Sequence, residues 1–167
     1  MPITIRHVEP SDYEALHKIF SGPKTVRGIS QTPYPSAEMW RKKLAEPPEG
    51  LYSLVACVEG EVVGQLGLHT SPGRPRRRHA GQIGIAVRDD WHGKGVGTAL
   101  MQAAIDLADN WVNLSRLELE VYTDNEPAIK LYQKFGFTIE GTGIHYGFRD
   151  GEFVDVYFMA RLRPTST

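Results

Sequence analysis

The chain has 167 residues, 41% of them hydrophobic and 23% charged, as in an ordinary globular domain, so we expect residues 1–167 to form one domain. Its 19 lysines and arginines nearly balance 20 aspartates and glutamates, which excludes a strong overall attraction to nucleic acid or an anionic membrane and favours a small-molecule partner. The single cysteine, Cys57, excludes an internal disulfide framework, and no apolar stretch reaches the roughly 20 residues of a membrane span, so we expect a cytoplasmic protein.

The first part of the chain predicts a strand followed by two helices. Alternating isoleucines near the N-terminus predict the strand, and Ser-Asp-Tyr-Glu at residues 11–14 predicts a capping box that opens a helix ending near Phe20. Residues 22–35 are rich in glycine, proline, serine and threonine, so we expect an irregular loop there. Ser36 then suits the cap of a second short helix.

The middle of the chain predicts a hairpin and then a strand, helix, strand unit. The β-rich runs 51–58 and 62–69 flank a tight turn, and a further β run follows at residues 79–87. Residues 116–123 form the next strand, which we expect to be parallel to the preceding one with a right-handed crossover. The intervening helix has an apolar stripe that we expect to pack on the sheet: Val96, Leu100, Ala103, Leu107 and Trp111.

The last part predicts a helix at residues 127–135, stopped by Gly136, and two strands joined by a turn at Asp150 and Gly151. The resulting fold class is α/β. We expect a central mixed sheet, mostly antiparallel but with one parallel βαβ unit, and helices on both faces.

Residues 92–98, His-Gly-Lys-Gly-Val-Gly-Thr, follow a predicted strand and open a predicted helix. Backbone N–H groups and the positive end of a helix favour an anion at such a place, and glycines let the main chain approach a phosphate. By themselves the glycines could equally serve only tight strand-to-helix packing. The P-loop ending Gly-Lys-Ser/Thr is missing, and Thr98 stands where a dinucleotide fingerprint has Gly or Ala.

This turn resembles the coenzyme A motif of the GNAT N-acetyltransferases, Gln/Arg-x-x-Gly-x-Gly/Ala, with His92 as the one departure. Further along, the chain reproduces the family signature N-x-x-A-x-x-L-Y-x-x-x-G-F with its spacing. The resemblance covers almost the whole chain and is nearest to bacterial L-amino-acid N-acetyltransferases, with phosphinothricin and methionine-sulfoximine acetyltransferases more distant. The residues of the second motif are Asn125, Ala128, Leu131, Tyr132, Gly136 and Phe137.

The resemblance implies acetyl-CoA as cofactor, coenzyme A as product, and direct acetyl transfer to a primary amine. The first candidate acceptor is the α-amino group of a small L-amino acid of the methionine or phenylalanine type. A protein N-terminus or lysine is the alternative, and a non-catalytic acyl-CoA sensor is the alternative of another class. The residues expected to bind the cofactor are Ile85, Ala86, Val87, His92, Gly93, Lys94, Gly95, Val96, Gly97, Thr98, Asn125, Ala128 and Tyr132.

Transfer from a thioester to an amine needs a base for the amine and a proton for the departing thiolate. The family places its acid at the position of Tyr132, although a tyrosine at helical spacing can also simply pack. Glu120 matches the position from which some members draw a base. Glu118 points to the same side, and the pair could instead belong to a half-solvated strand. Asn125 suits a helix cap as well as a cofactor contact.

The resemblance places acceptor recognition on the first two helices, their loop and the final hairpin, and Gln82 could orient a water molecule beside the base. That hairpin could also mediate a homodimer. The arginines at residues 74–78 favour a solvated loop, with an anion or subunit contact as alternative. Histidine and cysteine spacings match no metal motif, so no metal is expected. The acceptor-site candidates are Gln31, Tyr34, Glu38, Gln82, Tyr146 and Asp155.

Overall fold

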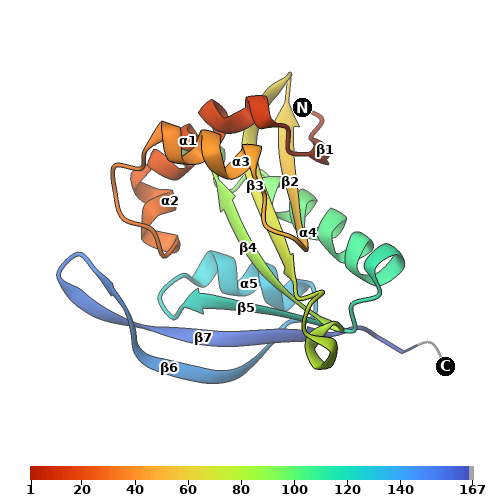
Figure 1. The fold of residues 1–167 in the computed structure, drawn as a ribbon. Helices are drawn as coiled ribbons and strands as arrows, with labels where there is room; N and C mark the ends of the chain where they lie inside the picture. The colour runs from red at the N-terminus through yellow and green to blue at the C-terminus, as the bar shows by residue number, and fades with distance from the viewer. Residues whose placement is uncertain (166–167) are drawn as a thin grey trace.

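The computed structural model describes residues 1–165, which form a sheet flanked by helices (Figure 1). The strands are β1 (Thr4–His7), β2 (Leu51–Val58), β3 (Glu61–Thr70), β4 (Ala80–Val87), β5 (Arg116–Tyr122), β6 (Thr138–Arg149) and β7 (Glu152–Leu162). The α-helices are α1 (Tyr13–Ser21), α2 (Pro23–Gly28), α3 (Ala37–Ala45), α4 (Val96–Leu107) and α5 (Glu126–Lys134). The strand order is β1-β2-β3-β4-β5-β7-β6, and every pair is antiparallel except β4 with β5. The predicted mixed sheet with one parallel unit is confirmed.

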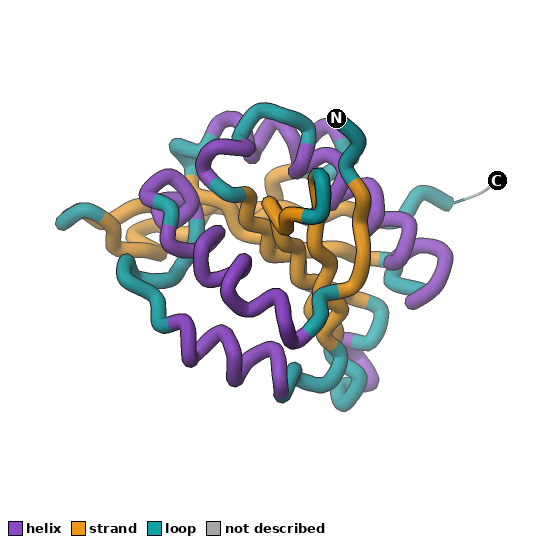
Figure 2. Tube along the Cα trace, turned by 90° about the horizontal axis from the view of Figure 1, so that it is seen from above, coloured by secondary structure: helices purple, strands orange, loops and turns teal. Residues whose placement is uncertain are grey.

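Helices cover both faces of the sheet, as Figure 2 shows and as the sequence predicts. The alternation of side chains along β2 explains this, because successive residues point to opposite faces. Val55 and Cys57 pack with Leu16 of α1 and Trp40 of α3, whereas Ala56 and its neighbour Val58 belong to the larger core under α4. Ser36 caps α3 as expected, its hydroxyl group accepting the N–H of Met39 at 3.2 Å.

The parallel pair separates soon after it forms. β4 and β5 are in register only from Ala80 with Arg116 to Gln82 with Glu118. Beyond that point the two strands diverge, as Figure 1 shows. The part of β4 beyond Gln82 is therefore paired on one side only, with β3. This divergence positions the site described below.

The prediction of an irregular loop at residues 22–35 is wrong, because α2 occupies part of it. The helix is held by a residue far away in the sequence. Asp89 accepts the main-chain N–H groups of Lys24 at 2.9 Å and Thr25 at 2.8 Å, and these are donors that a helix N-terminus leaves without intrahelical partners. A six-residue helix is marginal by itself, so the one local signal, a proline at its first position, did not suffice to predict it.

The predicted capping box at residues 11–14 is also displaced. A short 3-10 turn precedes α1, and the Asp12 carboxylate accepts the main-chain N–H of Glu9 at 2.7 Å. The same carboxylate is bound by the guanidinium of Arg6 on β1 at 2.8 Å. The capping box therefore joins Glu9 and Asp12, two residues earlier than expected, and the ion pair with Arg6 holds Asp12 there.

Trp111 does not belong to the buried face of α4, contrary to the predicted stripe. The helix passes into a π-helical turn at Ala108–Val112, which changes the angular step between side chains. The indole of Trp111 is consequently 77% exposed. The residues of this segment that are buried are Val96, Leu100, Met101, Ala104 and Ala108.

Candidate functional site

A cavity of about 320 Å³ opens where β4 and β5 separate. Its walls are the end of β4, the glycine turn with the start of α4, the beginning of α5, two residues of β5, and α2. All the residues predicted to bind the cofactor line it except Lys94, and Glu120 lines it as well. The two motifs singled out in the sequence thus meet at one place.

The main chain of β4 presents to this cavity an edge that is not paired with another strand. The N–H of Arg88 donates to Val63 of β3 at 2.8 Å, and hydrogen-bonding direction alternates along a strand. The polar groups of Ile85 and Val87 therefore face away from β3, toward the side where pairing with β5 ends at Gln82. Such an edge can pair with the amides of an extended ligand.

The glycine turn and α4 supply an anion site at one end of the cavity. Gly93 and Gly95 have φ of 74° and 86°, a left-handed conformation that side chains disfavour. Gly95 is the N-cap of α4, and in the described part of the chain no side chain accepts the first helical N–H groups. Those groups and the helix dipole can bind phosphate.

His92, the departure from the family motif, fastens the turn to the strand. Its Nε2 atom lies 2.7 Å from the carbonyl oxygen of Val87, which also accepts the hydroxyl group of Thr25 at 2.7 Å. Because a carbonyl only accepts, Nε2 carries the proton. Lys94, by contrast, turns its ammonium group over the ring of Trp91, 5.0 Å from the centroid.

Tyr132 packs against its neighbours and also lines the cavity. The side chain is 6% exposed and its ring lies 6.0 Å from that of Phe137. Burial raises the pKa of Tyr132 to about 12, since the phenolate would lose its hydration. The residue is therefore protonated at neutral pH, which is the form that a general acid needs.

The two glutamates of β5 lie on the same face but in different surroundings. Glu118 accepts hydrogen bonds from Arg116 at 2.6 Å and from Arg77 at 2.5 Å. Although burial opposes them, these bonds hold the pKa of Glu118 below its usual value. Glu120 instead lines the cavity and accepts the hydroxyl group of Tyr146 at 2.9 Å. Between the two candidates, the geometry favours Glu120 as base.

Asn125 caps α5 and also lies in the wall of the cavity. Its side-chain oxygen accepts the N–H of Ala128 at 3.4 Å, as a helix cap does, and the residue lines the cavity. Arg77 is the member of the arginine-rich loop that binds Glu118.

None of the six residues predicted for acceptor recognition lines the cavity. Tyr34 is 98% exposed and Glu38 is bound by Arg41 at 2.5 Å, while Gln31 and Gln82 are exposed. The other two lie on the closing hairpin: Tyr146 of β6 binds Glu120, and Asp155 of β7 binds the main chain of His145. Three residues of α2 and its C-cap line the cavity instead: Lys24, Thr25, Gly28 and Ile29. The sequence signal for this helix is a proline at its first position.

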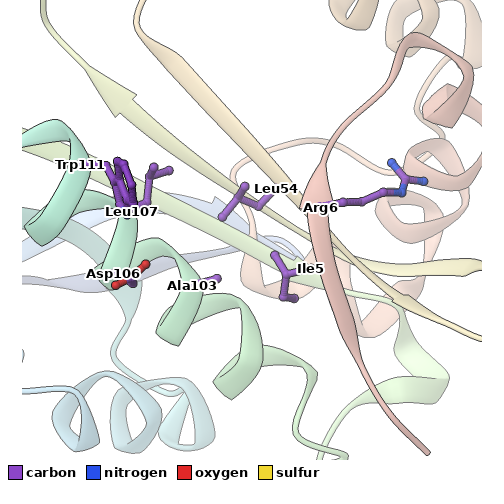
Figure 3. A pocket seen from close by; sticks show the side chains of 7 residues that line it. All are labelled: Ile5, Arg6, Leu54, Ala103, Asp106, Leu107 and Trp111. Atoms are coloured by element: carbon purple, nitrogen blue, oxygen red, sulfur yellow. The ribbon is translucent and has the colours of Figure 1, made fainter.

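A second hollow, of about 360 Å³, lies between β1, β2 and α4, beside the exposed Trp111 (Figure 3). Its walls are mostly apolar, with Ile5 and Leu54 facing Ala103. Arg6 turns its guanidinium away from the hollow, toward its partner Asp12. The hollow offers no paired acid and base, so we assign no chemistry to it.

Within residues 1–165, no helix is long and apolar enough to cross a membrane. The same part of the chain contains no cluster of three histidine, cysteine or acidic side chains placed to hold a metal ion.

Fold and cavity together define a class: an α/β protein that can hold an extended, phosphate-bearing cofactor along a strand edge, next to a carboxylate and a buried phenol. The model of the acetyltransferase (GNAT) family matches residues 13–137, and the chain therefore belongs to this family. It is an acetyl-CoA-dependent N-acetyltransferase, which moves an acetyl group to an amine.

Individual relatives agree with this assignment. The L-amino acid N-acetyltransferase AaaT of Escherichia coli (strain K12) is 48% identical over 161 residues, covering 96% of this chain and 98% of the relative. A crystal structure of a putative phosphinothricin N-acetyltransferase has a TM-score of 0.87 at 26% identity, covering 98% of this chain and 100% of the other. The structure of yncA from Salmonella typhimurium, solved with its cofactor acetyl-CoA, has a TM-score of 0.83 at 21% identity over 98% and 95% of the two chains.

Proposed function

We propose that the protein acetylates the α-amino group of a small L-amino acid or a close analogue. The observation that carries the proposal is Glu120, which among the described residues is the one carboxylate lining the cavity, beyond the unpaired edge of β4. The similarity to AaaT favours amino acids as the acceptor class.

The proposed reaction is direct transfer. Glu120, directly or through a water molecule, takes a proton from the acceptor ammonium, whose free lone pair then attacks the thioester carbonyl. A main-chain N–H of the β4 edge, near Ile85 or Val87, polarises that carbonyl. When the C–S bond breaks, Tyr132 donates its proton to the thiolate, and coenzyme A leaves as the thiol. The attacking nitrogen loses its second proton, which passes through water to the Tyr132 phenolate, and Glu120 releases the first proton to solvent, so that both groups regain their starting forms. The residues 93–98 hold the pyrophosphate.

The placement of α2 favours a small acceptor over a protein. The hydroxyl group of Tyr122 donates to the carbonyl of Ile29 at 3.1 Å, and Arg149 donates to the carbonyl of Arg27 at 3.1 Å. These contacts tie the end of α2 to β5 and to the closing hairpin. A peptide reaching Glu120 would have to pass this closed side.

The test is release of coenzyme A thiol over a panel of amines. We expect free L-amino acids to be turned over, and their N-blocked forms to be inactive. Peptides that outcompete free amino acids would move the acceptor to a protein N-terminus or lysine. Tight acetyl-CoA binding without thiol release on any amine, including polyamines and aminoglycosides, would favour a sensor.

We also propose that the protein acts in the cytoplasm as a homodimer. The buried free thiol of Cys57 suits a reducing compartment. The apolar side chains of Ile144, Phe148 and Phe153 are exposed on the β6–β7 hairpin, and a second copy of the chain would bury them. Sedimentation equilibrium should give twice the chain mass, and Phe148→Glu should give the monomer. A monomeric wild-type protein would contradict this.

A further inference from the structure

The strand β6 contains an insertion near Glu120. Glu120 lies in the part of the cavity where we place the acceptor, which we call the acceptor end. Gly143 pairs with Val156 and Gly147 with Val154, so residues 144–146 stand opposite the single residue Asp155. Two extra residues leave the alternation of side chains unchanged beyond the insertion, because that alternation has a period of two. The bulge thus changes the direction of only the side chains within it. Bulges beside active sites commonly redirect a side chain in this way.

The bulge is held in place by specific contacts. His145 has a φ of 53°, a left-handed conformation that is uncommon for a residue with a side chain. Its main-chain N–H donates to the Asp155 carboxylate at 2.8 Å, and its ring stacks on Phe153 with 4.8 Å between centroids. The main-chain carbonyl of Asp155 accepts the N–H of Thr123, just after β5, at 3.1 Å. Asp155 therefore links the bulge to the strand that carries Glu120.

Glycines beside the bulge leave space for the rings next to Glu120. A Cβ atom on Gly143 would lie 3.1 Å from the ring of Phe158, and one on Gly147 would lie 3.0 Å from the ring of Tyr122. Phe158 is the register partner of Glu120, and the ring of Tyr146 meets it edge-on at 5.5 Å. Tyr146 is thereby held across the face of the sheet.

The bulge directs the side chain of Tyr146 toward Glu120. Its hydroxyl group donates a hydrogen bond to Oε1 of Glu120 at 2.9 Å. We propose that Tyr146 is a positioning residue for the base: its hydroxyl group orients the Glu120 carboxylate, and the Asp155-held bulge orients Tyr146. This inference rests on the proposed role of Glu120. It assigns Tyr146 and Asp155 to the base rather than to direct recognition of the acceptor.

The first test compares Tyr146→Phe in the wild type and in Glu120→Gln. Because the hydrogen bond is solvent-exposed, we expect Tyr146→Phe alone to lower kcat by about threefold to tenfold, with an unchanged KM for acetyl-CoA. In the Glu120→Gln background it should cause no further loss. The matched control is Tyr13→Phe, which removes a hydroxyl bonded to Glu14 at 3.3 Å on α1 and should leave kcat unchanged.

The second test uses Asp155. Asp155→Ala should lower kcat as Tyr146→Phe does, and adding Tyr146→Phe to it should change little. Asp155→Asn, whose amide oxygen can still accept the His145 N–H, should retain most activity. Thermal denaturation of each variant identifies a loss due to unfolding.

The outcomes separate the two proposals. If Glu120→Gln is impaired while Tyr146→Phe equals the wild type, or if Tyr146→Phe costs the same in both backgrounds, only the positioning role is overturned. If Glu120→Gln retains wild-type turnover, the base itself is wrongly assigned and the positioning role falls with it.

Discussion

The two ends of the cavity are built from different parts of the chain. The cofactor end consists of main-chain groups from one continuous segment, the end of β4, the glycine turn and the start of α4. The acceptor end consists of side chains from α2 and β5, and Tyr146 of β6 contacts Glu120 there; these elements are far apart in the sequence. The first end should therefore tolerate side-chain changes, and the second should depend on individual residues.

The comparison of Glu120 with Glu118 is expected to have the largest effect. Glu120→Gln removes the base and should lower kcat by about 100-fold to 1,000-fold. Glu118→Gln makes the same chemical change on the same face of β5 but outside the cavity, and should leave kcat nearly unchanged. Steady-state kinetics on both variants measures this, and equal losses would contradict the distinction between the two carboxylates.

Tyr132→Phe should lower kcat by about 100-fold, since the leaving thiolate loses its proton donor while the packing of the ring is kept. The dissociation constant of acetyl-CoA should stay within about twofold, because the cofactor end binds through the main chain. Isothermal titration with acetyl-CoA and the thiol-release rate give the two values. Unchanged turnover would remove Tyr132 from the acid role.

Asp89→Ala should destabilise the acceptor end through α2. The side chain caps the helix by accepting two main-chain N–H groups, so its loss should cost about 1 to 2 kcal/mol of unfolding free energy. We also expect the KM for the acceptor to rise relative to the wild type, and to rise more than the KM for acetyl-CoA does. Asp89→Asn, which keeps one acceptor oxygen, is the matched control.

The Asp89 carboxylate also makes the stability of the protein depend on pH. Although burial opposes them, hydrogen bonds from Lys24 and Thr25 lower the pKa of Asp89. A depressed pKa contributes stability above the unfolded-state value, and this contribution is lost as pH falls through the folded-state value. The difference in unfolding free energy between Asp89→Ala and the wild type should therefore shrink as the pH falls below about 4. A constant difference at all acidic pH values would contradict this account.

Gly95→Ala should have the smallest effect and should act on the cofactor end alone. Space is open around the added methyl group, but the φ of 86° disfavours it by about 1 kcal/mol. We expect acetyl-CoA to bind about fivefold more weakly, with an unchanged KM for the acceptor. Gly73→Ala, also in open space but without a left-handed φ, should bind acetyl-CoA normally. If Gly95→Ala weakened only acceptor binding, the assignment of the glycine turn to the cofactor end would be contradicted.

The difference between the two ends also explains what the sequence could predict. The glycine turn and the helix cap at Asn125 are local patterns, so the cofactor segment and the order of elements could be predicted. The helix α2 depends on Asp89, more than 60 residues away, and the bulge on β6 depends on Asp155 across the hairpin. Propensity within a short window contains neither contact.

Exposed side chains were the hardest to assign. Tyr34 lies between two prolines and Glu38 in a first helical turn, and neither pattern distinguishes a ligand contact from solvent or from a neighbour such as Arg41. Glu118 and Glu120 alternate identically in the sequence, and tertiary contacts distinguish them: Arg77 and Arg116 bind Glu118, whereas Glu120 lines the cavity.

The central claim is that the cofactor and the base meet where β4 and β5 separate. The most direct measurement is a crystal structure with acetyl-CoA bound. The account predicts the pyrophosphate at residues 93–98, the pantetheine amides paired with the main chain of Ile85 and Val87, and the thioester between Glu120 and Tyr132. A cofactor lying elsewhere, or a thioester pointing away from Glu120, would contradict it.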